Sequence, residues 1–149
     1  MSEDIYMDKL IMRFQIFADD AQVSSMEGPY GEVTIIPFTV KVESELFTGE
    51  ILPGAADVQV ENLAGSRNMC AKYMFLGKDG SGNTCHLFVE NNGYFTKTNK
   101  NDKVFNAFPR FMTDSRILGA YLCQNRFRSE VEGKEWGVEI RIFDVLERG

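Results

Sequence analysis

Apolar and polar residues alternate with a period of two in several short segments of this chain, and no stretch shows the longer period of an amphipathic helix. The alternation is strictest near the two ends, at residues 10–16 and 136–142. Such alternation is typical of a β-strand with one buried face and one solvated face. The chain is therefore expected to fold mainly from strands.

Further strands are predicted between these ends, each an apolar segment bounded by residues that favour turns. They cover residues 33–42, 47–52, 57–61, 68–76, 84–90, 104–111 and 118–127. Turn residues separate them at 53–54, 78–83 and 91–93, and the segment 78–83 predicts a hairpin. Residues 19–31 are expected to form a long irregular loop, and one helical turn, capped by Thr113, is expected at 113–118.

About nine short strands with tight turns between them predict an all-β fold. We expect a single antiparallel, mostly up-and-down β-barrel of about eight to ten strands, with at most one or two short helical turns. A barrel is favoured over a sandwich because closure removes exposed strand edges. The length of 149 residues suits one domain, so residues 1–149 are expected to form one unit.

The charge of the chain argues against two classes of partner. The formal net charge is −6, and an acidic surface repels phosphate backbones and anionic headgroups. No nucleic acid and no membrane are therefore expected as partners, and no apolar run approaches membrane-spanning length.

A cytoplasmic location is expected from the cysteines and the N-terminus. Cys70, Cys85 and Cys123 are odd in number and fall in segments predicted to be apolar strands, which favours buried, reduced thiols. Residues 1–10 begin with acids, where a secretory signal would need basic residues and an apolar core.

Few residues form a catalytic or metal-binding pattern. His86 is the only histidine, and the adjacent Cys85 would point to the opposite face of a strand, so the two cannot act as a pair. Cysteine and histidine spacings typical of zinc sites are missing, as are phosphate-binding glycine loops and nucleophile elbows. We therefore expect neither a metal nor a cofactor, although the sequence leaves an oxygen-ligated cation open.

Aromatic residues make up 12% of the chain, and in a barrel they either fill the interior or line a slot for one small ligand. In the segment 118–127, Tyr121 and Asn125 would share a strand face with apolar neighbours. Tyr73 alternates in the same way with Ala71 and Phe75. Apolar walls with a few polar groups are typical of a small-molecule pocket, but a packed core remains an equal alternative.

An ordered set of short motifs resembles a known family. Residues 47–57 read FTGEILPGAAD, and further matching segments follow at 71–73, 78–80, 89–93, 108–111 and 121–125. Together they resemble the domain-of-unknown-function family thirty-two thirty-seven, also called uncharacterised protein family zero-three-eleven. The resemblance implies a lipocalin-like or streptavidin-like β-barrel and brings no settled activity.

The resemblance also implies a set of ligand-binding positions: Asp57, Tyr73, Asn91, Tyr121 and Asn125. The alternative for Asp57 and Asn91 is turn formation, because both flank glycine-containing bends in the sequence.

Three residues depart from the family pattern. Ala55 replaces a glycine, Val58 a tryptophan and Lys72 an arginine. If that arginine contacts an anion with both of its terminal nitrogens, Lys72 would be an imperfect substitute.

The sequence leaves three functions open. The first is the binding of a small, partly apolar or aromatic molecule in the barrel. The second is a cofactor-free isomerase, cyclase or lyase that uses a buried tyrosine or carboxylate. The third is a non-catalytic homo-oligomer, because both faces of the segment 68–76 are largely apolar.

Overall fold

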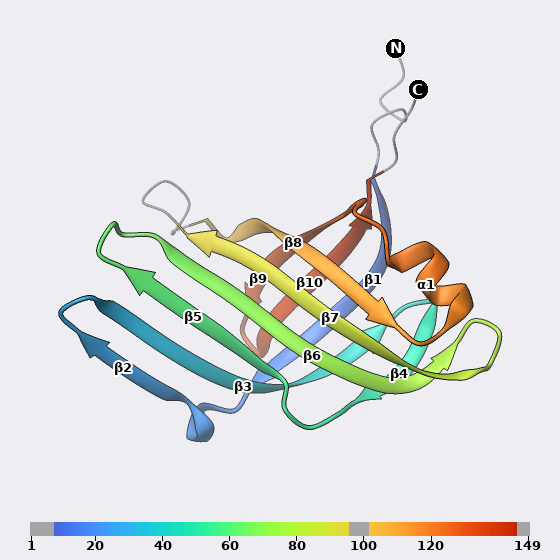
Figure 1. Cartoon of the computed structure of the whole chain (residues 1–149), viewed down its shortest axis with the longest axis horizontal. Coiled ribbons are helices and arrows are strands. Elements are labelled where there is room, and N and C mark those ends of the chain that lie inside the picture. Colours follow the sequence, from blue (N-terminus) through green and yellow to red (C-terminus); the bar gives the residue numbers. More distant parts are fainter. Residues whose placement is uncertain (1–7, 96–101, 146–149) are drawn as a thin grey trace, which may run out of the picture.

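The computed structural model describes residues 8–95 and 102–145, and the acidic residues 1–7 lie outside the described part of the chain. Within those ranges the chain forms ten strands, one α-helix and one 3-10 turn (Figure 1). The elements are β1 (Lys9–Ala18), η2 (Asp20–Gln22), β2 (Ser24–Gly28), β3 (Gly31–Glu43), β4 (Phe47–Ile51), β5 (Ala56–Asn62), β6 (Arg67–Asp79), β7 (Thr84–Phe95), β8 (Val104–Thr113), α1 (Arg116–Leu122), β9 (Phe127–Lys134) and β10 (Gly137–Asp144).

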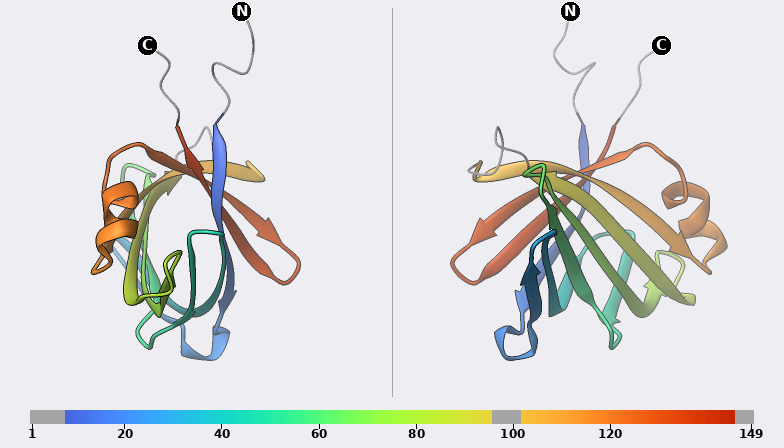
Figure 2. Two further views of the ribbon diagram at one scale, coloured as in Figure 1. Left: turned by 90° about the vertical axis from the view of Figure 1, so that its right-hand side faces the viewer. Right: turned by 60° about the vertical axis from the view of Figure 1, so that its left-hand side comes forward.

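The strands form one closed antiparallel barrel, which confirms the predicted fold class. From β6 to β10 each strand pairs with the next one in the sequence. The barrel closes because β1 pairs with β10 on one side and with β3 on the other. β4 and β5 occupy successive stretches between β3 and β6, and β2 extends from β3 as an outer strand. Figure 2 shows the strands curling round the shared interior.

The predicted hairpin at 78–83 is present between β6 and β7, and Asp79 organises it. Its Oδ1 accepts hydrogen bonds from the backbone nitrogens of Ser81 (2.9 Å) and Asn83 (3.1 Å). Gly82 takes a φ of +81°, which a residue without a side chain adopts at little cost. The other oxygen of Asp79 accepts from Ser115, which ties this hairpin to the start of α1.

The strand predicted at residues 118–127 is wrong. Residues 116–122 form α1, and its N-cap is Ser115 rather than Thr113. The Ser115 hydroxyl accepts from the backbone nitrogen of Leu118, whereas Thr113 donates its hydroxyl to a β7 carbonyl. Leu118 and Leu122 are both buried, and a spacing of four residues fits one face of a helix as well as one face of a strand.

Three smaller expectations are also corrected. Residues 91–93 are not a break but lie inside β7, where they pair with β6. The expected loop at 19–31 contains η2 and the strand β2. Trp136 lies before β10 and is exposed, rather than sharing the buried face of that strand.

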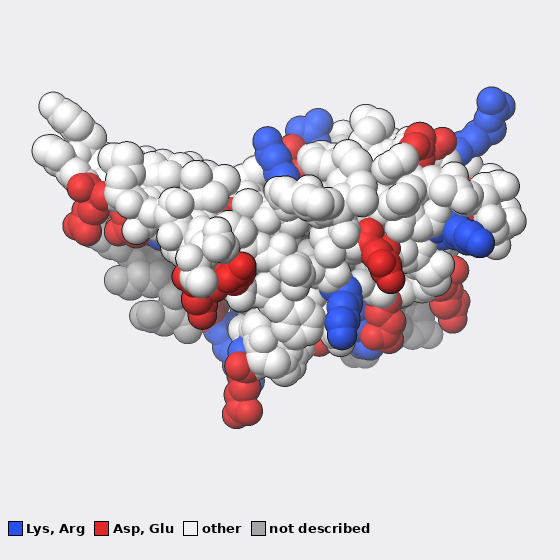
Figure 3. Space-filling view, turned by 90° about the horizontal axis from the view of Figure 1, so that it is seen from below, with Lys and Arg blue, Asp and Glu red and all other residues white. Residues whose placement is uncertain are grey.

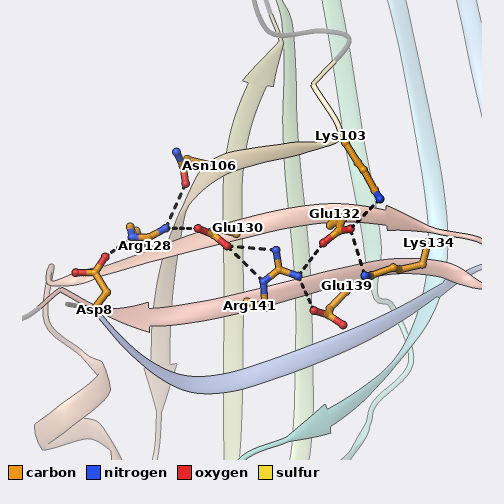
Figure 4. A network of polar contacts seen from close by, with 9 residues as sticks. All are labelled: Asp8, Lys103, Asn106, Arg128, Glu130, Glu132, Lys134, Glu139 and Arg141. Atoms are coloured by element: carbon orange, nitrogen blue, oxygen red, sulfur yellow. Dashed lines mark hydrogen bonds and ion pairs between the residues drawn. The ribbon is translucent and has the colours of Figure 1, made fainter.

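The outer surface of β9 and β10 carries a network of ion pairs (Figure 4). In the strand register Glu139 lies directly opposite Glu132, and two like charges in that position repel. Arg141 compensates by donating to Glu132 (3.0 Å), Glu139 (2.6 Å) and Glu130 (3.2 Å). Arg128 extends the network from Glu130 to Asp8, next to the start of β1. The seam at which the barrel closes is thus supported by alternating charges.

Elsewhere on the surface, acidic and basic side chains are mixed. On the face drawn in Figure 3, they are interspersed with wide areas of uncharged surface. In the described ranges, no helix is both long and apolar enough to span a membrane.

The three cysteines are free, but they are not all buried in strands as expected. Cys85 is buried in β7 and Cys70 is half-buried in β6. Cys123 is exposed at the end of α1, because the predicted strand there is a helix.

Candidate functional site

The interior of the barrel is packed at the end near α1 and hollow at the other end. In the packed half, the ring of Phe14 lies 5.2 Å from that of Tyr73 and 5.7 Å from that of Phe75, measured between centroids. Phe47 adds a further edge contact with Phe75. These rings fill that half of the barrel, and Phe38, which contacts Tyr73, separates them from the cavity.

The hollow half is a cavity of about 510 Å³. Interior-facing residues of β1, β3 and β5–β10 line it, and most of them are apolar, including Ile16, Phe38, Met69, Phe105, Val131 and Ile140. Cavities of this size hold small organic ligands. The aromatic interior is therefore packed in one half of the barrel and borders a cavity in the other half.

Asp57 is the most unusual polar group in the cavity wall. Its Oδ2 accepts a hydrogen bond of 2.7 Å from Nε2 of Gln59, but Oδ1 is buried and has no partner among the described residues. Burial raises the pKa of Asp57 above its ordinary value, and the Gln59 hydrogen bond and the Arg67 charge oppose that rise. The cavity wall therefore contains a carboxyl group with one unsatisfied hydrogen-bond acceptor.

Gln59 and Arg67 hold the Asp57 carboxyl in place. Nε of Arg67 donates to Oε1 of Gln59 at 2.7 Å, so the Gln59 amide must turn its nitrogen toward Asp57. Arg67 itself is anchored by Glu32 (3.2 Å) and lies 3.6 Å from Glu61. The chain from Arg67 through Gln59 to Asp57 determines which carboxyl oxygen remains free.

Asn91 is the second polar group of the wall. Its Oδ1 accepts a hydrogen bond of 2.8 Å from the Ser129 hydroxyl, and both side chains are buried. The amide nitrogen of Asn91 is then directed away from Ser129 and is free to donate. It makes no hydrogen bond that the structure records among the described residues.

Asp57 and Asn91 belong to the same row across the barrel wall. Asp57 pairs with Ala71 of β6, and Ala71 pairs with Asn91 of β7. Two strand spacings separate their backbones by roughly 10 Å. The small side chain of Ala71 leaves the space between the two polar groups open.

Residues 9–136 match a family described as protein of unknown function, DUF3237. The chain belongs to the DUF3237 family. The resemblance stated from the motifs is therefore confirmed. No match was found among curated proteins.

Solved structures resemble this DUF3237 chain over nearly its whole length. A protein of unknown function from Clostridium acetobutylicum ATCC 824 is 21% identical with a TM-score of 0.73, covering 94% of this chain and 99% of that one. A conserved protein of unknown function from Rhodopseudomonas palustris is 26% identical with a TM-score of 0.69, covering 95% and 98%. A β-barrel-like protein from Acinetobacter baumannii AYE is 18% identical with a TM-score of 0.69, covering 93% and 94%. These similarities support the barrel and assign no activity.

Of the five ligand-binding positions expected from the DUF3237 resemblance, the structure brings Asp57 and Asn91 together in the cavity. Their alternative role in turns is wrong, because both lie inside strands with their side chains facing the interior. Tyr73 lies in the packed half, two residues beyond Ala71 on the same face of β6, and is not part of the cavity lining. Its hydroxyl is buried without a partner among the described residues, and burial raises its pKa far above the ordinary value.

Tyr121 and Asn125 do not join them. Tyr121 lies on α1, where its hydroxyl donates to Asp144 of β10. Burial and this hydrogen bond raise the pKa of Tyr121 to about 12. Arg126 also binds Asp144, at 2.8 Å, so these groups close the packed end of the barrel. Asn125 is exposed in the loop before β9. Both positions were expected on a strand that the structure replaces with a helix.

The family departures at Val58 and Lys72 have no effect on the cavity. Both side chains lie on the outer face of the barrel and are exposed. Lys72 therefore has no contact with a ligand in this cavity.

Sequence reasoning missed Gln59, Arg67 and Ser129. Gln59 follows Asp57 by two residues on the same strand face, so alternation would have indicated it. Ser129 alternates in the same way with Phe127 and Val131 once β9 is correctly placed. Arg67 carried no such signal, because its contact with Gln59 depends on the pairing of β5 with β6.

Asp102 and Lys103 also line the cavity, ahead of β8, whereas His86 lies outside it. His86 is exposed on the surface, where its Nδ1 lies 2.7 Å from Oδ2 of Asp114. In residues 8–95 and 102–145, no cluster of three His, Cys, Asp or Glu side chains could hold a metal ion.

Proposed function

We propose that this protein binds a small, largely apolar or aromatic molecule in the open half of the barrel. The observation that carries the proposal is the buried, unpartnered Oδ1 of Asp57 in a mostly apolar cavity of about 510 Å³. A buried polar atom without a partner costs free energy, and a ligand that supplies a hydrogen bond would remove that cost.

The arrangement of polar groups constrains the ligand. One side of the cavity offers the Asp57 carboxyl and the Asn91 amide, while the other walls are mostly apolar, with Asp102 and Lys103 ahead of β8. A complementary molecule has an apolar or aromatic body and one polar edge, with a donor for Asp57 and an acceptor for Asn91. The small side chain between these residues, Ala71, allows the polar edge to approach the wall.

The proposal is tested with the neutral fluorescent probe N-phenyl-1-naphthylamine, which brightens in apolar surroundings. We expect saturable binding to the wild type and at least about tenfold weaker binding to Ala71→Leu, because the larger side chain would occupy the cavity. Met74→Leu is the matched control, since Met74 lies on the outer face of the same strand. Equal binding to wild type and Ala71→Leu would show that the probe does not use the cavity and would contradict the proposal.

Mass spectrometry of an organic extract of the purified protein provides a second test. A small molecule that co-purifies with the wild type and is lost from Ala71→Leu would support the proposal and supply the identity of the ligand.

Self-association is a second candidate, favoured by exposed apolar side chains on the outer face of the barrel. Val58, Met74, Leu76, Phe108 and Met112 contribute to this face from β5, β6 and β8. Contiguous apolar surface of this kind is common at protein interfaces. A homo-oligomer would be compatible with ligand binding, because these side chains point away from the cavity.

A further inference from the structure

The free oxygen of Asp57 has the surroundings of a base. Oδ1 is buried in the wall of a mostly apolar cavity and makes no hydrogen bond of ordinary geometry with the described residues, although the nearby backbone of Cys70 favours the carboxylate. Burial of this kind raises the pKa of the Asp57 carboxyl, which makes its ionised form more basic than that of a solvated aspartate.

Gln59 and Arg67 act as positioning residues for this base. Because the Gln59 oxygen accepts from Arg67 at 2.7 Å and its nitrogen donates to Oδ2 of Asp57 at 2.7 Å, the carboxyl cannot rotate without breaking a hydrogen bond. The same contacts limit the rise in the pKa of Asp57, since both favour the carboxylate. Oδ1 therefore keeps a constant direction.

Asn91 supplies a neutral hydrogen-bond donor on the same wall. Ser129 holds the amide oxygen of Asn91 at 2.8 Å, so the amide nitrogen faces away from Ser129. A donor held in place by the protein can stabilise negative charge that develops on a substrate, at little cost of reorganisation. The roughly 10 Å between the Asp57 and Asn91 backbones leaves room for one ring between the two side chains.

Resting on the binding function proposed above, we propose that the cavity performs proton transfer at carbon, with the Asp57 carboxylate as the base and the Asn91 amide as the donor to the atom that becomes negative. The substrates are neutral apolar or aromatic compounds with an acidic C–H next to a C=O or C=N group.

The step balances without a cofactor. Oδ1 of Asp57 takes the proton from carbon, and the electron pair of the C–H bond forms a new C=C bond. The carbonyl π pair moves onto oxygen, which accepts a hydrogen bond from Asn91. In a substrate with a further C=C bond one position along, the oxygen pair then re-forms the C=O bond and the new C=C pair shifts by one position. The pair of the further C=C bond takes the proton back from Asp57 at its far carbon, which gives the conjugated isomer.

The probe for the test is 5-nitrobenzisoxazole, a neutral aromatic carbon acid. A base removes the proton from its ring carbon, the C–H electron pair forms the C≡N bond, and the N–O bond breaks to release a coloured cyanophenolate. We expect the wild type to accelerate this reaction over buffer and Asp57→Asn to lose at least about 100-fold of that rate. Asp20→Asn, an exposed aspartate outside the cavity, is the matched control and should retain the wild-type rate.

A pH–rate profile separates a chemical role from a structural one. The rate should rise with pH through an inflection above 3.8, the ordinary value for aspartate, because burial raises the pKa of Asp57. Gln59→Leu should move that inflection to higher pH, because it removes a hydrogen bond to the carboxylate.

Other charged groups near the cavity belong to several elements. Glu32 of β3, Glu61 of β5 and Arg67 of β6 form the ion-pair group behind Gln59, and Asp102 and Lys103 line the cavity ahead of β8. The inflection is assigned to Asp57 only if it disappears in Asp57→Asn.

Binding is measured separately, by displacement of N-phenyl-1-naphthylamine. Displacement without acceleration, or an equal rate in Asp57→Asn, would overturn the proton-transfer proposal and leave ligand binding intact. Failure of 5-nitrobenzisoxazole to displace a bound probe would likewise overturn it for aromatic carbon acids. If the wild type does not bind N-phenyl-1-naphthylamine at all, the result contradicts the proposed binding function on which proton transfer rests.

Discussion

The hydroxyl of Ser129 donates a 2.8 Å hydrogen bond to Oδ1 of Asn91, although β8 lies between the strands that carry them. The contact passes over the interior face of β8 at Ala107, whose small side chain leaves room for it. Both partners are buried, so neither can exchange this bond for water. The bond holds the Asn91 amide in one orientation toward the cavity.

Ser129→Ala should lower the free energy of unfolding by about 1–2 kcal/mol, because it leaves the buried oxygen of Asn91 without a donor. The measurement is urea unfolding monitored by circular dichroism. Ser25→Ala, on the exposed strand β2, serves as the control and should change stability by less than about 0.5 kcal/mol. An unchanged stability in Ser129→Ala would mean that another group satisfies Asn91.

Tyr73→Phe should leave the fold intact and raise the free energy of unfolding of the ligand-free protein by about 1 kcal/mol, because the deleted hydroxyl is buried without a partner among the described residues. It should also weaken binding of a ligand that extends past Phe38 of the cavity lining to Tyr73. Thermal unfolding checks the first expectation, and titration with the co-purified molecule checks the second. A large loss of stability would show that the hydroxyl has a partner.

The stability difference between Asp57→Asn and the wild type should grow as the pH rises. Burial raises the folded-state pKa of Asp57 above 3.8, so ionisation is disfavoured in the folded protein. Below pH 3.8 the carboxyl is protonated in both states and contributes no penalty. As the pH rises through the folded-state pKa, the wild type loses stability that Asp57→Asn, which cannot ionise, retains.

Urea unfolding between pH 3 and pH 8 measures this difference. Asp20→Asn should show a flat difference from the wild type, because Asp20 is exposed. The pKa values of Asp79 and Glu130 are lowered, so both proteins lose stability from these groups as the pH falls. This loss is equal in the two proteins and cancels in the stability difference. A difference that is flat for Asp57→Asn as well would contradict the assigned environment.

Arg141→Met should cost about 1 kcal/mol at low salt, because it removes the cation that separates Glu130, Glu132 and Glu139. The loss should shrink in 1 M NaCl, where charge repulsion is screened. Lys134→Met is a milder variant of the same network, since Lys134 contacts Glu132 alone, at 3.2 Å. A loss that is independent of salt would point to packing by the Arg141 side chain instead.

If the outer apolar face of β5, β6 and β8 forms a homo-oligomer, Met74→Lys should convert it to a monomer. Met74 is exposed on this face, so the substitution should leave the barrel folded. Size-exclusion chromatography with light scattering measures the mass, and Ser25→Lys on the exposed strand β2, away from this face, is a control that should not alter it. A wild type that is monomeric at micromolar concentration would remove the self-association proposal.

Local sequence was most informative where one face of a strand is buried and the other is not. In β10 and in β1 from Met12 onward, every second side chain contributes to the core. Leu10 is exposed instead of sharing the buried face, because the register shifts between Leu10 and Met12. The hairpin at 78–83 was equally readable, since Asp79 and Gly82 make their turn with neighbouring backbone.

The sequence pattern gave a wrong prediction where a strand and a helix would both place the same residues on one face. Leu118 and Leu122 are compatible with a strand or a helix, and the choice depends on Ser115, which both caps α1 and bonds to Asp79. At residues 91–93 the turn propensity of asparagine and glycine was overridden by the ladder to β6 and by the bond from Asn91 to Ser129.

Alternation along the chain therefore determined that the protein is all-β, because the periodicity of side chains in a strand is a local property, whereas closure into a barrel depends on the pairing of β1 with β3 and β10. The cavity was decided by tertiary structure alone. Only strand pairing sets Asp57, Ala71 and Asn91 in one row and brings Arg67 behind Gln59, and the hydrogen bonds that define pairing join residues far apart in sequence. The same closure leaves one end of the barrel filled by aromatic rings and the other end open.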